Sequence, residues 1–164
     1  MKNQFFLTLA IAIFSLSAMA QTVPSVKLKT TDGKTLDTAT LVGKGKPVII
    51  SFWATWCSPC KRELNVYAEH VEEWAEEFGV EVIAVSIDDQ RTVARVAPYI
   101  NSVEWDYTVL LDPNKDFARA MQVINVPHTF LVDANGKIVW QNNNFSDGDE
   151  EEMYEQLKKL KGKK

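Results

Sequence analysis

The chain has 164 residues, of which 46% are apolar and 24% are charged, proportions typical of a single globular domain. Its 18 basic and 22 acidic side chains give a formal net charge of −4. This acidic balance argues against nucleic acid as a partner, because phosphate binding requires clustered Lys and Arg. No stretch approaches the roughly 18 apolar residues of a membrane-spanning helix, so we expect no stable membrane span.

Residues 1–20 have the pattern of a secretory signal peptide. Lys2 gives a positive start, an apolar run extends from Phe5 to Phe14, and Ala18-Met19-Ala20 has the small-x-small pattern of a cleavage site. A buried N-terminal helix and an uncleaved anchor are the alternatives. We expect residues 1–20 to be removed, and residues 21–164 to form one domain that is soluble and periplasmic.

The first half of this domain predicts two buried strands joined by a long helix. Residues 21–46 form an N-terminal extension with a hairpin turn at Thr31-Asp32-Gly33-Lys34. The elements that follow are a strand over Val48–Phe52, a helix that begins near Cys57–Pro59 and stops at Gly79, and a strand over Val80–Ser86.

The second half adds helices, a further strand and a late hairpin. The pattern predicts a helix over Thr92–Ile100, a strand over Tyr107–Leu111, a helix opened by Asp112-Pro113-Asn114, strands over His128–Val132 and Ile138–Gln141, and a last helix through Met153, Leu157 and Leu160. The two late strands are joined by a turn that contains Asn135-Gly136. Because early strands alternate with helices and the last two form a hairpin, we expect an α/β fold with a mixed central β-sheet flanked by helices.

Two cysteines, Cys57 and Cys60, are the sharpest clue to function. Disulfides that stabilise secreted proteins close long loops, whereas a bond between these two would constrain the unfolded chain little. The pair is therefore better explained by redox chemistry than by an inert structural bridge. Export to an oxidising compartment would make that chemistry relevant.

The position of the pair, between a buried strand and a helix start, suggests a role for each sulfur. Free N–H groups and the helix dipole favour an anion there, which lowers the pKa of a thiol from about 8.5. Cys57 is predicted to attack as a thiolate, and Cys60 to resolve the mixed disulfide. Ser58-Pro59 constrain the turn between them, while Trp53 and Trp56 either shield the site or pack in the core.

A metal site is the main competing interpretation of the two cysteines. Four protein ligands are usual for structural zinc, and the chain has no second cysteine pair. His70 and His128 are the only histidines, so a copper or zinc site would have to combine Cys57, Cys60 and His128. We predict no physiological metal, and keep a copper-binding module that uses both cysteines as an alternative.

The stretch Phe52-Trp53-Ala54-Thr55-Trp56-Cys57-Ser58-Pro59-Cys60 resembles the active-site signature of thioredoxin. From about Val26 to the C-terminal helix, the chain is most similar to the exported TlpA/ResA-like branch of the thioredoxin superfamily. The resemblance implies a thioredoxin fold with an N-terminal extension and a helix-strand insertion, here between Asp88 and Asp112. No cofactor is implied, because the two sulfurs carry the electrons.

The resemblance also implies a substrate-binding surface around the cysteines. Proteins of this family carry a cis-proline at the position of Val126-Pro127, facing the Cys-x-x-Cys loop, which leaves the Val126 backbone free to pair with an extended substrate chain. An ordinary trans-proline at a strand start is the alternative. Trp56, Ser58, Pro59, Val126 and Pro127 are therefore the predicted substrate-binding residues.

Glu63 is the predicted third catalytic residue. Helical spacing places it on the side of Cys60, and in this branch an acid at this position is implicated in proton transfer. Thioredoxin itself has a buried Asp where this chain has Ser51, so Glu63 is the candidate substitute. The alternative is a first-turn Glu that complements the helix dipole. His128 is expected to be a solvated strand-edge residue and is assigned no catalytic role; tuning of the site by its charge below neutral pH is the alternative.

Together these features predict a thiol-disulfide oxidoreductase that acts on protein thiols or disulfides outside the cytoplasm through the Cys57/Cys60 couple. The resemblance favours action as a reductant, which requires an upstream thiol donor to recharge the enzyme. A thiol peroxidase, whose fold is similar, and the copper-binding module remain the alternatives.

Overall fold

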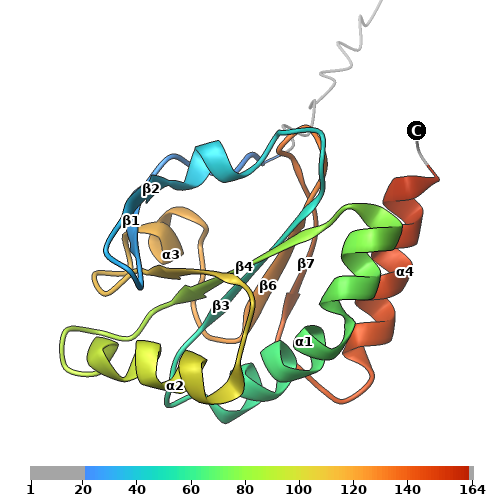
Figure 1. Ribbon diagram of the computed structural model, residues 1–164. Helices are drawn as coiled ribbons and strands as arrows, with labels where there is room; N and C mark the ends of the chain where they lie inside the picture. Colours follow the sequence, from blue (N-terminus) through green and yellow to red (C-terminus); the bar gives the residue numbers. More distant parts are fainter. Residues whose placement is uncertain (1–20, 163–164) are drawn as a thin grey trace, which may run out of the picture.

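Seven strands form one mixed sheet in the computed structural model, which describes residues 21–162 (Figure 1). The predicted signal peptide lies outside the described residues. In the spatial order β2-β1-β5-β4-β3-β6-β7, the strands are β1 Lys27–Thr30, β2 Thr35–Asp37, β3 Val48–Trp53, β4 Glu81–Ser86, β5 Thr108–Leu111, β6 His128–Val132 and β7 Ile138–Asn143. The predicted α/β fold with a mixed sheet is confirmed.

The centre of the sheet is parallel, and its flanks are antiparallel. β3 runs parallel to β4, and β4 to β5, whereas β6 pairs antiparallel with β3 and β1 antiparallel with β5. β3 is buried along its whole length, which fits its apolar sequence and its place between β4 and β6. This strand therefore supports the loop at its C-terminal end from a fixed position in the core.

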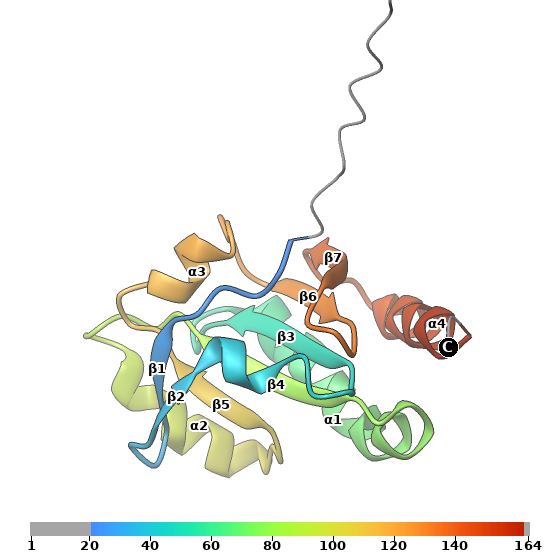
Figure 2. The same cartoon turned by 90° about the horizontal axis from the view of Figure 1, so that it is seen from above.

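Helices cover both faces of the sheet. Within residues 21–162 the α-helices are α1 Ser58–Phe78, α2 Val96–Val103, α3 Asp116–Ala120 and α4 Asp149–Lys161. Figure 2 shows α1 and α2 on one face, as right-handed crossovers between neighbouring parallel strands require, and α3 on the other. α4 lies beside α1, where the Tyr154 hydroxyl donates to Glu77 at 3.1 Å. No helix between residues 21 and 162 is long and apolar enough to cross a membrane.

Two helices differ from their predicted bounds. The helix expected from Asp112 begins at Asp116 instead, because the Asp112 carboxylate accepts hydrogen bonds from the backbone N–H groups of Asp116 and Ala118, both at 2.8 Å. The helix predicted over Thr92–Ile100 is a short 3-10 turn, η2 Val93–Arg95, that continues into α2. α2 and β5 together form the predicted helix-strand insertion.

The N-terminal extension is tied to the sheet at both of its ends. β1 and β2 form the predicted hairpin, a 3-10 turn (η1 Thr38–Leu41) follows, and β1 pairs with β5. Upstream, Thr22 bridges Lys137, and the N–H of Ile138 donates to the carbonyl of Gln21 at 2.9 Å. The described chain thus begins at the turn between β6 and β7, beside the N-terminal end of β3.

Aromatic side chains anchor the last two residues of β3 on opposite faces of the sheet. The Phe52 ring lies 5.2 Å from that of Phe117 on α3, and the Trp53 ring lies 5.0 Å, edge-on, from that of Trp105. Both side chains are fully buried. The cysteine motif therefore follows directly from a rigid strand end.

Candidate active site

Cys57 and Cys60 lie where β3 gives way to α1. The loop between them and β3 is a tight turn, closed by the Cys57 N–H donating to the carbonyl of Ala54 at 3.0 Å. Cys57 is the N-cap of α1, and its sulfur accepts a hydrogen bond from the N–H of Cys60 at 3.3 Å. Pro59 occupies the first turn, where its missing N–H costs nothing. The predicted placement of both cysteines at a helix start is confirmed.

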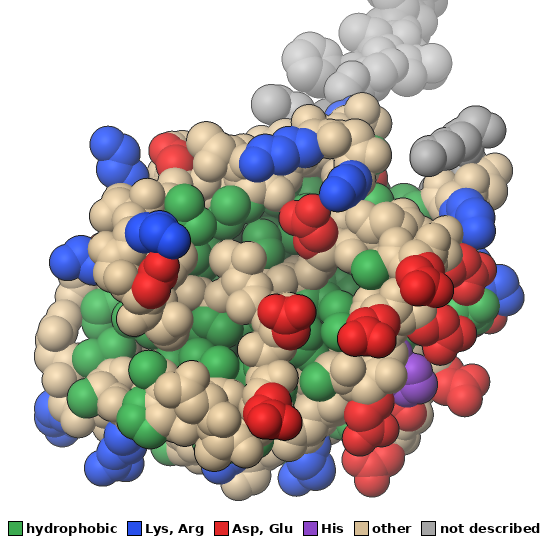
Figure 3. Space-filling view, viewed as in Figure 1, with side chains coloured by type: hydrophobic (Ala, Val, Ile, Leu, Met, Phe, Trp, Pro, Cys, Tyr) green, Lys and Arg blue, Asp and Glu red, His purple; other side chains and the backbone are tan. Residues whose placement is uncertain are grey.

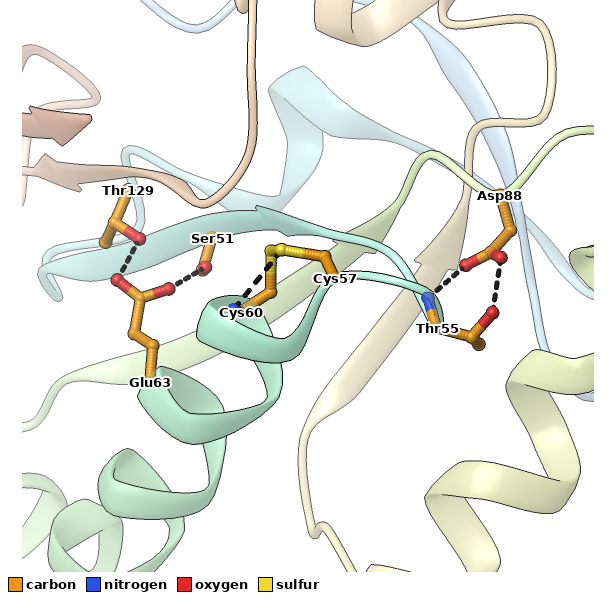
Figure 4. The surroundings of a disulfide bond; sticks show 7 residues. All are labelled: Ser51, Thr55, Cys57, Cys60, Glu63, Asp88 and Thr129. Atoms are coloured by element: carbon orange, nitrogen blue, oxygen red, sulfur yellow. Dashed lines mark hydrogen bonds between the residues drawn. A yellow bond between two sulfur atoms is a disulfide. The ribbon is translucent and has the colours of Figure 1, made fainter. Parts of the chain in front are cut away.

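The two cysteines are joined by a disulfide, with their Cα atoms 5.4 Å apart (Figure 4). Cys60 is completely buried, whereas 6% of Cys57 remains exposed. Both cysteines are thus buried, and Cys57 is the one nearer to an incoming sulfur. This geometry supports Cys57 as the attacking thiol, although the two roles stay predictions.

Glu63 is buried beneath the disulfide, one helical turn beyond Cys60. Its carboxylate accepts hydrogen bonds of 2.7 Å each from the hydroxyls of Ser51 on β3 and Thr129 on β6 (Figure 4). The Tyr67 hydroxyl is 3.5 Å away. Burial raises the pKa of Glu63 from 4.5 to about 7, against the opposing effect of the hydroxyl hydrogen bonds. Glu63 can therefore exchange a proton near neutral pH, and it is not an exposed first-turn residue.

A second buried carboxylate, Asp88, holds the loop on the other side of the disulfide (Figure 4). It accepts hydrogen bonds from the Thr55 N–H at 2.8 Å, the Thr55 hydroxyl at 2.6 Å and the Ser86 hydroxyl at 2.9 Å. Sequence reasoning did not find this residue. The available signal was an acid two residues after β4, because the carboxyl ends of the parallel strands β3 and β4 meet at one edge of the sheet.

The residues predicted to bind substrate differ in exposure. Trp56 is 58% exposed and Ser58 is exposed, Pro59 and Val126 are half-buried, and Pro127 is buried. Trp53 is wholly a core residue, so Trp56 alone of the two tryptophans lies at the surface. These positions leave Trp56 and Ser58 accessible beside Cys57, and their contact with a substrate stays a prediction.

The Val126-Pro127 peptide bond is cis, as the family resemblance implied. It immediately precedes β6, whose first residue is paired with Phe52 of β3. Among the described residues, neither the N–H nor the carbonyl of Val126 forms a backbone hydrogen bond. Its backbone groups therefore have no backbone partner within the described chain, and their pairing with an extended substrate stays a prediction.

The expectation that His128 is solvated is wrong. The side chain is 7% exposed, because β6 lies between β3 and β7, and its ring stacks on Phe130 with the centroids 4.3 Å apart. Its Nε2 lies 3.1 Å from the Gln141 Oε1. Burial lowers the pKa of His128, which favours a neutral ring at neutral pH.

A separate hollow lies between α1 and α4, away from the cysteines. It has a volume of about 280 Å³, and its lining includes His70, Glu73, Trp74, Glu150 and Tyr154. Acidic side chains gather over these two helices (Figure 3), in keeping with the acidic composition. Within residues 21–162, no group of three or more His, Cys, Asp and Glu side chains is arranged to hold a metal ion.

Comparison with known proteins places this geometry in a family. Residues 19–141 match the AhpC/TSA family. The thiol-disulfide oxidoreductase ResA of Bacillus subtilis is 34% identical over 116 residues, which are 71% of this chain and 62% of that protein. ResA of Bacillus thuringiensis is 32% identical over 71% of this chain and 65% of that protein. The chain thus spans slightly less than two thirds of the length of these relatives.

Solved structures show the same fold. An uncharacterized thioredoxin-like protein from Porphyromonas gingivalis is 46% identical, with a TM-score of 0.75 over 84% of this chain and 90% of that one. A putative thiol:disulfide interchange protein DsbE from Chlorobium tepidum is 26% identical, with a TM-score of 0.75 over 86% of this chain and 96% of that one. The chain therefore belongs to the AhpC/TSA family, has a thioredoxin-like fold, and resembles the ResA-like thiol-disulfide oxidoreductases.

Proposed function

We propose that the protein is a thiol-disulfide oxidoreductase that acts on protein cysteines through the Cys57–Cys60 couple. The observation that carries the proposal is the disulfide at the start of α1, in which Cys57 is 6% exposed and Cys60 is completely buried. A structural bridge would gain little stability from so short a loop. The similarity to ResA, which is 34% identical over 116 residues, supports the same class of activity.

In the reductive direction, the Cys57 thiolate attacks one sulfur of a substrate disulfide. The substrate S–S bond breaks, a mixed disulfide forms, and the first substrate sulfur leaves as a thiolate that takes up a proton. Cys60 then loses its proton and attacks the Cys57 sulfur, which releases the second substrate thiol and forms the Cys57–Cys60 disulfide. Two electrons pass to the substrate, and an upstream dithiol must supply two to recharge the enzyme.

Glu63 is proposed to serve the second half of this sequence. It lies one turn from Cys60 on α1, is buried, and has a pKa of about 7, so it can accept the proton that Cys60 loses. Trp56, Ser58 and the Val126 backbone are proposed to bind the substrate chain beside Cys57. We infer a periplasmic location and action as a reductant from the signal-peptide pattern of residues 1–20 and the family resemblance.

Redox titration of the purified protein tests the proposal. We expect a reversible two-electron couple in dithiothreitol or glutathione buffers, reduction of a model protein disulfide, loss of that activity in Cys57→Ser, and a trapped mixed disulfide in Cys60→Ser. A strongly negative reduction potential would support action as a reductant. A high reduction potential would instead indicate an oxidant or isomerase. Peroxide turnover without disulfide exchange would favour the peroxidase alternative, and stoichiometric copper binding without a redox couple would favour the copper-binding module.

A further inference from the structure

The disulfide lies between two buried carboxylates, and the proposed mechanism uses only one of them. Glu63 lies on the side of Cys60, whereas Asp88 lies beside the loop that leads to Cys57 (Figure 4). Asp88 is completely buried, and no cation pairs with it among the described residues. Burying a carboxylate without a cation is costly unless hydrogen-bond donors replace its water. What these donors hold in place indicates what Asp88 does.

Two of the three donors belong to Thr55, two residues before Cys57. The Thr55 N–H donates to one oxygen of Asp88 at 2.8 Å, and the Thr55 hydroxyl donates to the other at 2.6 Å. The carboxylate therefore holds this residue by two hydrogen bonds. The Ser86 hydroxyl donates to Asp88 at 2.9 Å and accepts from the Asp88 N–H at 3.1 Å, which fixes the carboxylate against the end of β4. Asp88 therefore connects a rigid strand to the loop that carries the attacking sulfur.

The importance of this connection depends on the redox state. In the oxidised protein, the covalent bond to Cys60 holds the Cys57 sulfur at the helix start. After reduction that bond is gone, and the sulfur is held through the turn between Ala54 and Cys57, the N–H of Cys60 and the attachment of Thr55 to Asp88. A thiolate gains from the helix N-terminus only while it stays within the first turn.

We propose that Asp88 is a positioning residue that, by binding Thr55, keeps the Cys57 sulfur at the N-terminus of α1 when the dithiol is reduced. The inference rests on the proposed function, because it concerns the attacking thiolate of that reaction. Asp88 touches neither sulfur and acts through Thr55. Loss of the attachment between Asp88 and Thr55 should therefore destabilise the reduced dithiol form more than the oxidised disulfide form.

Three variants separate this role from a direct effect of charge. Thr55→Val removes the hydroxyl bond and keeps the Asp88 charge, while Thr55→Ser restores a hydroxyl at the same place. Asp88→Asn keeps the shape, since its amide oxygen can accept from the Thr55 N–H and its NH₂ can donate to the Thr55 hydroxyl, and it removes the charge. Asp89→Asn is the matched control, because the neighbouring Asp89 binds Arg91 and does not contact Thr55.

The readouts are the pH profile of iodoacetamide alkylation of Cys57 in the reduced protein and the equilibrium constant with glutathione. For Thr55→Val we expect the midpoint of the alkylation profile to rise by roughly one pH unit, because loss of the helix-start environment raises the thiol pKa by about that amount. At a pH above the midpoints of both proteins, where Cys57 is a thiolate, the equilibrium should move about tenfold toward the disulfide, which is a potential about 30 mV more negative. Thr55→Ser, Asp88→Asn and Asp89→Asn should stay within about threefold of the wild type on the same scale.

The wild-type couple is measured first, because its absence would overturn the proposed function itself. A normal wild-type couple, with Thr55→Val unchanged in both readouts, would overturn only the positioning role of Asp88. Faster alkylation in Asp88→Asn with no change in Thr55→Val would also overturn it, since Asp88 would then act through its charge. Urea unfolding of the oxidised variants shows that each one is folded.

Discussion

Replacement of Glu63 by Gln should remove a pH dependence from the stability of the protein. In the folded chain, burial holds the pKa of Glu63 at about 7, compared with an ordinary value of 4.5. Below pH 4.5 the carboxyl is protonated in both the folded and the unfolded chain. As the pH rises toward 7, the unfolded chain ionises while buried Glu63 keeps its proton, so the free energy of unfolding of the wild type falls.

The size of this effect follows from the difference between the two pKa values. Each unit corresponds to about 1.4 kcal/mol, so the wild type loses about 3 kcal/mol between pH 4.5 and pH 8 through this group. Gln cannot ionise, and its amide can still bond the hydroxyls of Ser51 and Thr129. The free energy of unfolding of Glu63→Gln, minus that of the wild type, should therefore rise by about 3 kcal/mol over this range and level off above pH 7.

Urea unfolding of the oxidised proteins at half-unit steps of pH measures this difference, and other titrating groups cancel in it. Oxidised protein is used so that the cysteines do not titrate. Glu69→Gln, at an exposed position of α1, is the matched control and should leave the pH dependence unchanged. Parallel curves for the wild type and Glu63→Gln would refute the buried-acid reasoning.

The other predictions concern the neighbours of the site. Thr129→Val removes a hydroxyl that lowers the pKa of Glu63, so the midpoint of the wild-type pH dependence should move upward from about 7; an unchanged midpoint in urea titrations would contradict this. Phe52→Ala should lower the free energy of unfolding by about 3–5 kcal/mol, measured in urea at pH 7, and a loss below about 1 kcal/mol would mean that its pocket collapses. Trp56→Ala should raise KM for a protein disulfide severalfold while the free energy of unfolding changes by less than about 0.5 kcal/mol, because Trp56 is 58% exposed. An unchanged KM would remove Trp56 from the substrate site.

Features set by local sequence could be predicted well. The apolar run of β3 and the Pro59 that opens α1 place the cysteines at the junction of a strand and a helix, as the structure has them. The hairpins and the order of strands and helices also follow from local pattern and turn residues. Element boundaries differ from the prediction where a side chain outside the helix binds its first backbone N–H groups, as Asp112 does for α3.

Features set by tertiary pairing could not be predicted in this way. His128 looked like an edge residue, because the sequence does not show that β6 has neighbours on both sides. The contact between Asp88 and Thr55 joins residues 33 positions apart and depends on β3 and β4 ending at the same edge. Helical spacing places Glu63 near Cys60, but local pattern does not show that its carboxylate is buried and bound by hydroxyls from two separate strands.

The attachment of Gln21 at the turn between β6 and β7 has a practical consequence for handling the protein. β3 starts beside this turn and ends just before Cys57, so its six residues separate the two places by about 20 Å. A purification tag, fluorophore or immobilising linker joined ahead of Gln21 would therefore leave the molecule at the end opposite to the dithiol. Assays on a surface coupled in this way should present Cys57 outward, where a bulky substrate can reach it.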